Sequence, residues 1–144
     1  MSQKIRWNEP YYFYYFQLPN GIKKFGITYD LEQRKKQYEK RHRIIIDEFI
    51  FIDNIDKGWK AFLYEQVVRF LCEKFISKGV NEWIKDSIPK EVVTDAYSLA
   101  KEKLSIDLYR YQSIHKEDYQ DQKAYYKQLA NMIGGYPGKI DDWV

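Results

Sequence analysis

Hydrophobic and polar residues divide the first third of the chain into short apolar runs separated by turn residues. Tyr11 to Leu18 is a continuous aromatic and aliphatic run. It favours a buried strand, because it is too short for a helix and rich in strand-forming residues. Pro19-Asn20-Gly21 then breaks the run. Proline sets one turn position and Asn-Gly accepts positive φ, so Ile22 to Ile27 is predicted to return as the antiparallel partner in a β-hairpin.

A basic helix and a third strand are predicted after this hairpin. Thr28 or Asp30 caps a helix from Leu31 to about Arg41, since both residue types accept hydrogen bonds from a first helical turn. Arg43 to Ile52 is dense in β-branched and aromatic residues, which predicts a mostly buried strand. Asp53-Asn54 is predicted to end that strand.

The second half of the chain has the spacing of helices. From Trp59 to about Ser77, apolar residues recur three and four positions apart, the mark of an amphipathic helix, and Lys78-Gly79 stops it. Asn81-Glu82-Trp83-Ile84 is predicted to be irregular or extended. Pro89 suits the first turn of a helix that runs to about Lys103, and a last helix is predicted from Lys116 to Met132.

These elements predict an α+β domain, with a three-stranded antiparallel sheet over residues 11–52 flanked by helices. A chain of 144 residues has room for one domain with a single core. Residues 11–90 form the predicted core, and residues 91–144 a helical C-terminal extension. The composition, 44% hydrophobic and 31% charged, is typical of a globular protein.

The distribution of charge is more informative than the net charge of +3. Between residues 34 and 43, six basic side chains stand against a single acid. This density predicts a positive surface of the kind that nucleic acids bind. The only cysteine, Cys72, lies in an apolar helical stretch and is predicted to be in the core. The N-terminus lacks a signal-peptide run, and no window approaches the ~18 apolar residues of a membrane span, so we expect a cytoplasmic protein without a membrane partner.

Several residues whose side chains could take part in catalysis stand at defined spacings along these elements. Tyr14 closes Tyr12-Phe13-Tyr14 in the first strand, and Lys24-Phe25-Gly26 lies in the second. Arg34 follows eight residues beyond Gly26, and Glu65 stands among mostly apolar residues of the later helix. This arrangement resembles the GIY-YIG nuclease family, whose two name motifs, helical arginine and catalytic acid occupy the corresponding positions.

Two positions depart from the family's usual residues: Lys24 stands where a tyrosine is usual, and Tyr38 where a histidine is usual. A restriction-enzyme branch of the family shows both exchanges together. Asn81-Glu82-Trp83-Ile84 resembles a Glu-Trp-Phe element of phage-encoded relatives. The resemblance covers residues 11–90 and implies a nuclease of homing or restriction type. Such a nuclease could be encoded by a phage and act in the cytoplasm of a bacterial host.

The resemblance implies a metal-dependent DNA endonuclease that leaves a 5′-phosphate, with Mg²⁺ or Mn²⁺ at Glu65. The residue types suit this chemistry. Glu65 is a hard oxygen ligand, and Arg34 offers a fixed fork to phosphate oxygens. Tyr14 is the expected base, since Lys24 can favour its phenolate. Tyr38, one helical turn from Arg34, is expected to bind the phosphate or orient the water.

Six further polar residues are expected to contact DNA along the basic helix and after the acid-bearing helix: Lys35, Lys36, Lys40, Arg41, Arg43 and Asn81. Binding through them is expected to weaken steeply with salt. Residues 92–144 either add recognition elements or mediate dimerisation.

Each candidate residue also has a simpler interpretation. Tyr14 alone is most often a core tyrosine, and Arg34 alone the start of a solvated basic face. The chain is therefore alternatively a DNA-binding protein without turnover, or a phage protein-interaction module. The latter would dock its partner through five C-terminal aromatic residues: Tyr109, Tyr111, Tyr119, Tyr125 and Tyr126.

Overall fold

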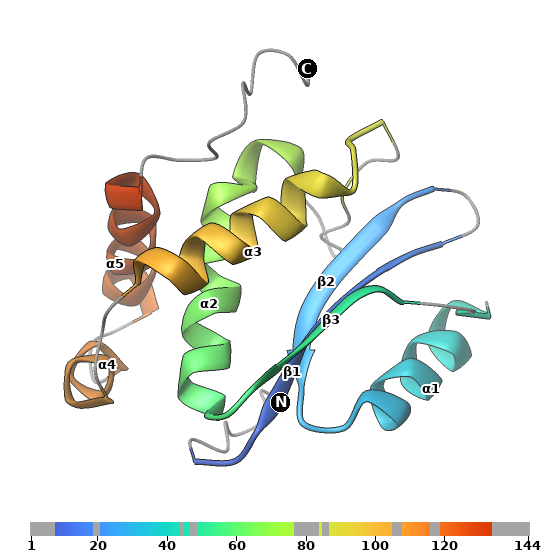
Figure 1. Ribbon diagram of the computed structural model, residues 1–144, viewed down its shortest axis with the longest axis horizontal. Coiled ribbons are helices and arrows are strands. Elements are labelled where there is room, and N and C mark those ends of the chain that lie inside the picture. The colour runs from blue at the N-terminus through green and yellow to red at the C-terminus, as the bar shows by residue number, and fades with distance from the viewer. Residues whose placement is uncertain are drawn as a thin grey trace.

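The computed structural model describes residues 8–18, 21–43, 45–46, 49–76, 84, 87–104, 108–115 and 119–133. Its centre is a three-stranded antiparallel sheet in the order β2-β1-β3 (Figure 1). The strands are β1 (Tyr11–Gln17), β2 (Lys23–Thr28) and β3 (Phe49–Ile55). The predicted α+β class, with a sheet packed against helices and a helical C-terminal part, is confirmed.

The central strand β1 buries both of its faces, which is why it is a continuous apolar run. Phe13 and Tyr15 enter a large core with α2 (Gly58–Leu71) and α3 (Glu91–Lys103). Tyr14 and Phe16 enter a second, smaller core under α1 (Leu31–His42). The two cores lie on opposite faces of the sheet, with α1 on one side and α2 and α3 on the other (Figure 1).

Local chemistry sets the hairpin and the start of α1. Gly21 has φ 91°, a backbone conformation that glycine adopts without strain. Asp30 is the N-cap of α1, and its Oδ1 accepts a hydrogen bond from the Gln33 N–H at 3.0 Å. The Thr28 hydroxyl accepts from the Asp30 N–H at 3.1 Å, so Asp30 rather than Thr28 caps the helix.

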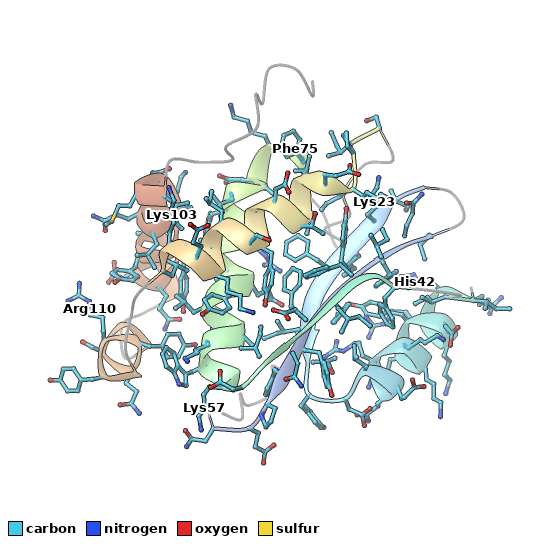
Figure 2. All side chains as sticks on the ribbon, viewed as in Figure 1. Lys23, His42, Lys57, Phe75, Lys103 and Arg110 are labelled. Carbon is cyan, nitrogen blue, oxygen red and sulfur yellow. The ribbon has the colours of Figure 1, made fainter. Side chains whose placement is uncertain are left out.

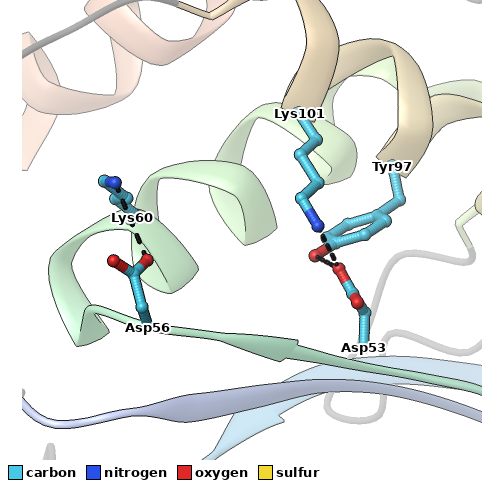
Figure 3. A network of polar contacts seen from close by, with 5 residues as sticks. All are labelled: Asp53, Asp56, Lys60, Tyr97 and Lys101. Carbon is cyan, nitrogen blue, oxygen red and sulfur yellow. Dashed lines mark hydrogen bonds and ion pairs between the residues drawn. The ribbon is translucent and has the colours of Figure 1, made fainter.

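The third strand begins and ends later than the sequence predicts. Arg43 closes α1 in a left-handed conformation with φ 54°, and β3 begins only at Phe49. Asp53, the expected strand end, lies inside β3. Its Oδ2 accepts a hydrogen bond from the Tyr97 hydroxyl at 2.6 Å and pairs with Lys101 Nζ at 2.7 Å (Figure 3). Partners on α3 therefore allow an acid in a position where the sequence alone indicates a strand end.

The helices differ from their predicted limits. The helix α2 ends at Leu71 rather than Ser77, and a short 3-10 turn, η1 (Glu73–Phe75), follows it. Cys72 between them is buried, as predicted. The helix α5 (Tyr119–Ile133) takes the place of the helix predicted from Lys116, and α4 (Leu108–His115) is an element that the sequence pattern does not predict.

The C-terminal helices complete the large core on the far side of α2 (Figure 1). Tyr111 of α4 contacts the rings of Trp59 and Phe62 at 5.7 and 6.3 Å, and Tyr126 of α5 contacts Phe62 at 6.1 Å. Ile84 exchanges backbone hydrogen bonds with Lys23 at 2.8 and 2.9 Å, which extends pairing beyond β2. None of the described helices is long and apolar enough to cross a membrane.

Candidate active site

Two buried tyrosines form the centre of the candidate site. Tyr14 on β1 is 2% exposed and Tyr38 on α1 is 7% exposed. Their hydroxyl oxygens lie 2.9 Å apart, in hydrogen-bond contact. A residue 24 positions away thus satisfies the hydroxyl of Tyr14 inside the smaller core. The pair links the sheet directly to α1.

Gly26 allows Tyr14 to occupy this position. The two residues are direct cross-strand partners in β1 and β2. A Cβ at Gly26 would lie 2.5 Å from the Tyr14 hydroxyl oxygen and 2.8 Å from Cζ. The ring therefore passes over the glycine, where no other residue fits without a shift. The sequence spacing singles out Gly26 only as a motif residue, and the cross-strand register explains why a glycine is needed there.

Lys24 lies on the same face as the tyrosine pair. Its Nζ stands over the Tyr38 ring, 5.4 Å from the centroid, within cation–π range. The adjacent Lys23 is buried, and its Nζ donates to the carbonyl of Gly21 at 3.3 Å. Strand alternation therefore separates the two lysines, and Lys24 is the one beside Tyr38.

Glu65 approaches from α2, across the edge strand β2. Burial raises the pKa of its carboxyl, and Arg69, Gln66, the backbone N–H of Ile27 and Arg34 each oppose that rise. Gln66 Nε2 donates to Glu65 Oε1 at 3.1 Å. Burial outweighs these contributions, so the carboxyl ionises less readily than an exposed glutamate. A divalent cation beside Glu65 would favour the carboxylate.

Arg34 and Glu65 both act electrostatically on Tyr14. Burial raises the pKa of Tyr14 well above its ordinary value, and Tyr38 and Glu65 raise it further, while Arg34 lowers it. Burial outweighs the nearby cation, so Tyr14 is a protonated phenol at neutral pH. This differs from the phenolate that the sequence favours. Lys24 stands opposite Phe16 in the strand register, two pairs away from the pair of Tyr14 and Gly26.

Five candidate residues thus come from four elements and meet around β2: Tyr14 from β1, Lys24 from β2, Arg34 and Tyr38 from α1, and Glu65 from α2. Because β2 is an edge strand, Arg34 on α1 and Glu65 on α2, which come from opposite faces of the sheet, are both near enough to Tyr14 to act on it electrostatically.

The residues expected to contact DNA divide into three groups. Lys36, Lys40, Arg41 and Arg43 are exposed on the outward face and end of α1. Lys35 is partly buried beside Arg34. Asn81 lies outside the described residues. The exposed members form one positive surface, which we call the α1 basic surface: Lys36, Lys40, Arg41 and Arg43.

His42 is a further neighbour of the site and is not among the candidate residues predicted from the sequence. Its ring stacks on Tyr38, with centroids 6.1 Å apart and an interplanar angle of 17°. The two residues are four positions apart on α1, a spacing that brings side chains together on one helix face. This four-residue spacing is the feature of the sequence from which the contact between His42 and Tyr38 could be predicted. The Tyr38 ring thus neighbours both Lys24 and His42.

A single carboxylate, that of Glu65, is the metal ligand that the candidate residues offer. No group of three or more histidine, cysteine or acidic residues suited to hold a metal is found in the described parts of the chain. Mg²⁺ accepts one or two carboxylates and keeps several waters, so the single acid Glu65 suits it.

Comparison of the chain with protein-family models, with curated proteins and with solved structures finds no match. What is established is the three-stranded antiparallel sheet packed against helices, together with the side-chain geometry around β2.

Proposed function

We propose that this chain is a metal-dependent DNA endonuclease of the GIY-YIG type. The observation that carries the proposal is the tyrosine pair at 2.9 Å, with Lys24 over one ring and the charges of Arg34 and Glu65 acting on the other tyrosine. These are the residues that the family resemblance assigns to catalysis. They are far apart in the sequence and come together in space.

The set supplies what phosphodiester hydrolysis needs. A divalent ion bound by Glu65 would lower the pKa of a bound water and offset negative charge. Arg34 presents a planar fork that suits two phosphate oxygens. Lys24 adds a second cation on the side of Tyr38. Positive groups placed where negative charge develops are commonly the largest catalytic contribution.

The tyrosines serve best as hydrogen-bonding and positioning groups. Because Tyr14 is protonated, it does not act as a phenolate base at neutral pH. The hydrogen bond between the two hydroxyls fixes the position of Tyr38 on the same helix as Arg34. We therefore assign Tyr38 to orienting the phosphate or the water, and Tyr14 to holding Tyr38.

The α1 basic surface is the proposed DNA contact. It occupies the same helix as Arg34, so phosphates bound along the outward face of α1 would bring a neighbouring phosphate toward the site. Such contacts are independent of base sequence and sensitive to salt.

Cleavage of supercoiled plasmid with Mg²⁺ or Mn²⁺, against EDTA, tests the proposal. We expect metal-dependent nicking by the wild type and a loss of at least about 100-fold in Glu65→Ala, since removing one key electrostatic group commonly has that effect. Glu73→Ala is the matched control, because it removes an exposed carboxylate from the turn after α2. Equal cleavage by Glu65→Ala and wild type would refute the assignment of Glu65.

A DNA-binding protein without turnover is the second candidate. It is favoured by the burial of both tyrosine side chains, which are each less than 10% exposed. Salt-sensitive duplex binding without cleavage in any metal would establish it instead. The third interpretation, docking through C-terminal aromatics, is weakened at two of its residues, since Tyr111 and Tyr126 are buried in the chain's own core.

A further inference from the structure

A pocket lies on the side of the molecule away from α1, at the end of α3 and between α4 and α5. Its volume is about 570 Å³, within the ~300–1,000 Å³ typical of small-molecule sites. Figure 2 shows two of its lining residues, Lys103 and Arg110, on the opposite side of the molecule from His42. Nothing in the proposed nuclease chemistry uses this pocket.

The lining combines cations, planar groups and apolar walls. Lys103 and Arg110 are both exposed, and no acidic side chain is among the described lining residues. Leu129 and Met132 supply apolar surface, and Met132 is 76% exposed. Gln128 adds an amide that both donates and accepts hydrogen bonds. A ligand that suits this pocket carries negative charge on an apolar or aromatic body.

The most specific feature is a contact between a guanidinium group and an aromatic ring, both among the lining residues. The Arg110 guanidinium lies over the Tyr125 ring, 5.7 Å from its centroid, and Arg110 Nε donates to the Tyr125 hydroxyl at 3.4 Å. Aromatic rings and guanidinium planes are the groups on which unpaired bases stack. An extended acidic peptide makes little use of stacked planes.

We propose that this pocket binds an unpaired nucleotide of single-stranded nucleic acid. The base stacks on the Arg110–Tyr125 pair against the apolar wall of Leu129 and Met132, and Gln128 contacts its edge. Lys103 and Arg110 attract the flanking phosphates. The inference does not depend on cleavage, because no residue of the tyrosine site takes part in it.

The test is a titration of the intact chain, in EDTA, with a 5′-phosphorylated, fluorescein-labelled oligodeoxynucleotide of about six nucleotides, followed by fluorescence anisotropy. We expect Tyr125→Ala to weaken binding by roughly tenfold, a typical effect of removing one stacking ring. Tyr125→Phe keeps the ring and should bind within about twofold of wild type. Arg110→Gln should weaken binding about as much as Tyr125→Ala. If Tyr125→Ala does not fold, Arg110→Gln tests the proposal in its place.

Lys127→Gln is the matched charge control. Lys127 is exposed on the same helix as Tyr125 but does not line the pocket. A reduction in affinity equal to that of Arg110→Gln would show that only general charge matters, and would overturn the proposal. So would unchanged binding by both Tyr125→Ala and Arg110→Gln.

Photocrosslinking locates the bound strand. An oligonucleotide carrying 5-iododeoxyuridine should crosslink to Tyr125 or Met132, as mapped by mass spectrometry, and Glu65→Ala should crosslink equally. Crosslinks confined to α1 would overturn the proposal. The proposal would also be overturned if an acidic aromatic peptide bound in a way that depends on Arg110 while binding of the oligonucleotide did not depend on Arg110. The binding and crosslinking experiments are done without metal, so they do not depend on cleavage. Failure of the nuclease proposal would appear only in the plasmid assay.

Discussion

Substitution of Gly26 by alanine tests the geometry of the tyrosine pair directly. The added Cβ would lie 2.5 Å from the Tyr14 hydroxyl oxygen and 2.8 Å from Cζ, and ring atoms cannot yield as a flexible chain end can. Overpacking of this kind costs about 1–3 kcal/mol. If the ring moves away, the hydrogen bond to Tyr38 also breaks, at a cost of about 0.5–1.5 kcal/mol. We expect a total destabilisation of roughly 2–4 kcal/mol, centred on the sum of the midpoints of these two ranges.

The measurement is urea unfolding of four proteins: wild type, Gly26→Ala, Tyr14→Leu and the double variant. Once leucine replaces the tyrosine, the ring no longer passes over Gly26. Alanine should then be neutral or stabilising by about 0.5–1 kcal/mol, because glycine is unfavourable inside a strand. The coupling between the two sites should exceed about 1 kcal/mol, as expected for residues in contact. A Gly26→Ala protein as stable as wild type, with Tyr14 in place, would refute the close approach.

Three further expectations follow from the structure. Partial burial acts to raise the pKa of Asp53, but hydrogen bonds from Lys101 and Tyr97 outweigh it and hold that pKa below its usual range. The contribution of Asp53 to stability is therefore present above the unfolded pKa of about 3.9 and disappears as pH falls through the lower folded value. Asp53→Asn should cost about 1 kcal/mol in urea unfolding at pH 7 and progressively less as the pH is lowered below about 3.9, and a cost that does not change with pH would count against the pairing. Burial raises the pKa of the Cys72 thiol to about 12, so it should resist alkylation in the folded protein and react in urea; rapid labelling of native protein would contradict its burial. The variants Lys36→Gln, Lys40→Gln and Arg41→Gln, combined in one protein, remove three charges from the α1 basic surface. For duplex binding, the slope of log K against log salt concentration should become shallower by about 0.9 for each phosphate that is no longer neutralised. Lys74→Gln on η1 should leave this slope unchanged.

Local signals in the sequence predict those parts of the fold that local chemistry determines. The turn at Gly21 and the cap at Asp30 depend on neighbouring residues alone, and both the hairpin and the start of α1 follow from them. The limits of β3, in contrast, do not follow from neighbouring residues. Asp53 belongs to the strand because Lys101, 48 residues later, holds its carboxylate, and no window of sequence around Asp53 contains that information.

The same division applies to the candidate site. The family resemblance selects Tyr14, Gly26 and Arg34 by their spacing along the chain, and spacing predicts side-chain placement only within one strand, hairpin or helix. The protonation state of Tyr14 follows from its burial under α1 and from its contact with Tyr38, which only the packed structure reveals. A lysine two positions from Gly26 in the sequence suggests the opposite state.

The position of α2 connects the candidate site to the C-terminal helices. One side of α2 carries Glu65 toward β2, and the rings of Trp59 and Phe62 on the same helix pack against Tyr111 of α4. The large core is therefore continuous across residue 90, where the sequence suggests a boundary between a nuclease core and an extension. A fragment ending there would expose this face of α2, and large exposed apolar surfaces favour association or rearrangement. In the proposed nuclease, the helix that carries Glu65 needs a fixed position relative to the other candidate residues, since small displacements are costly in catalysis. The C-terminal helices thus hold α2, and with it Glu65, in place through packing.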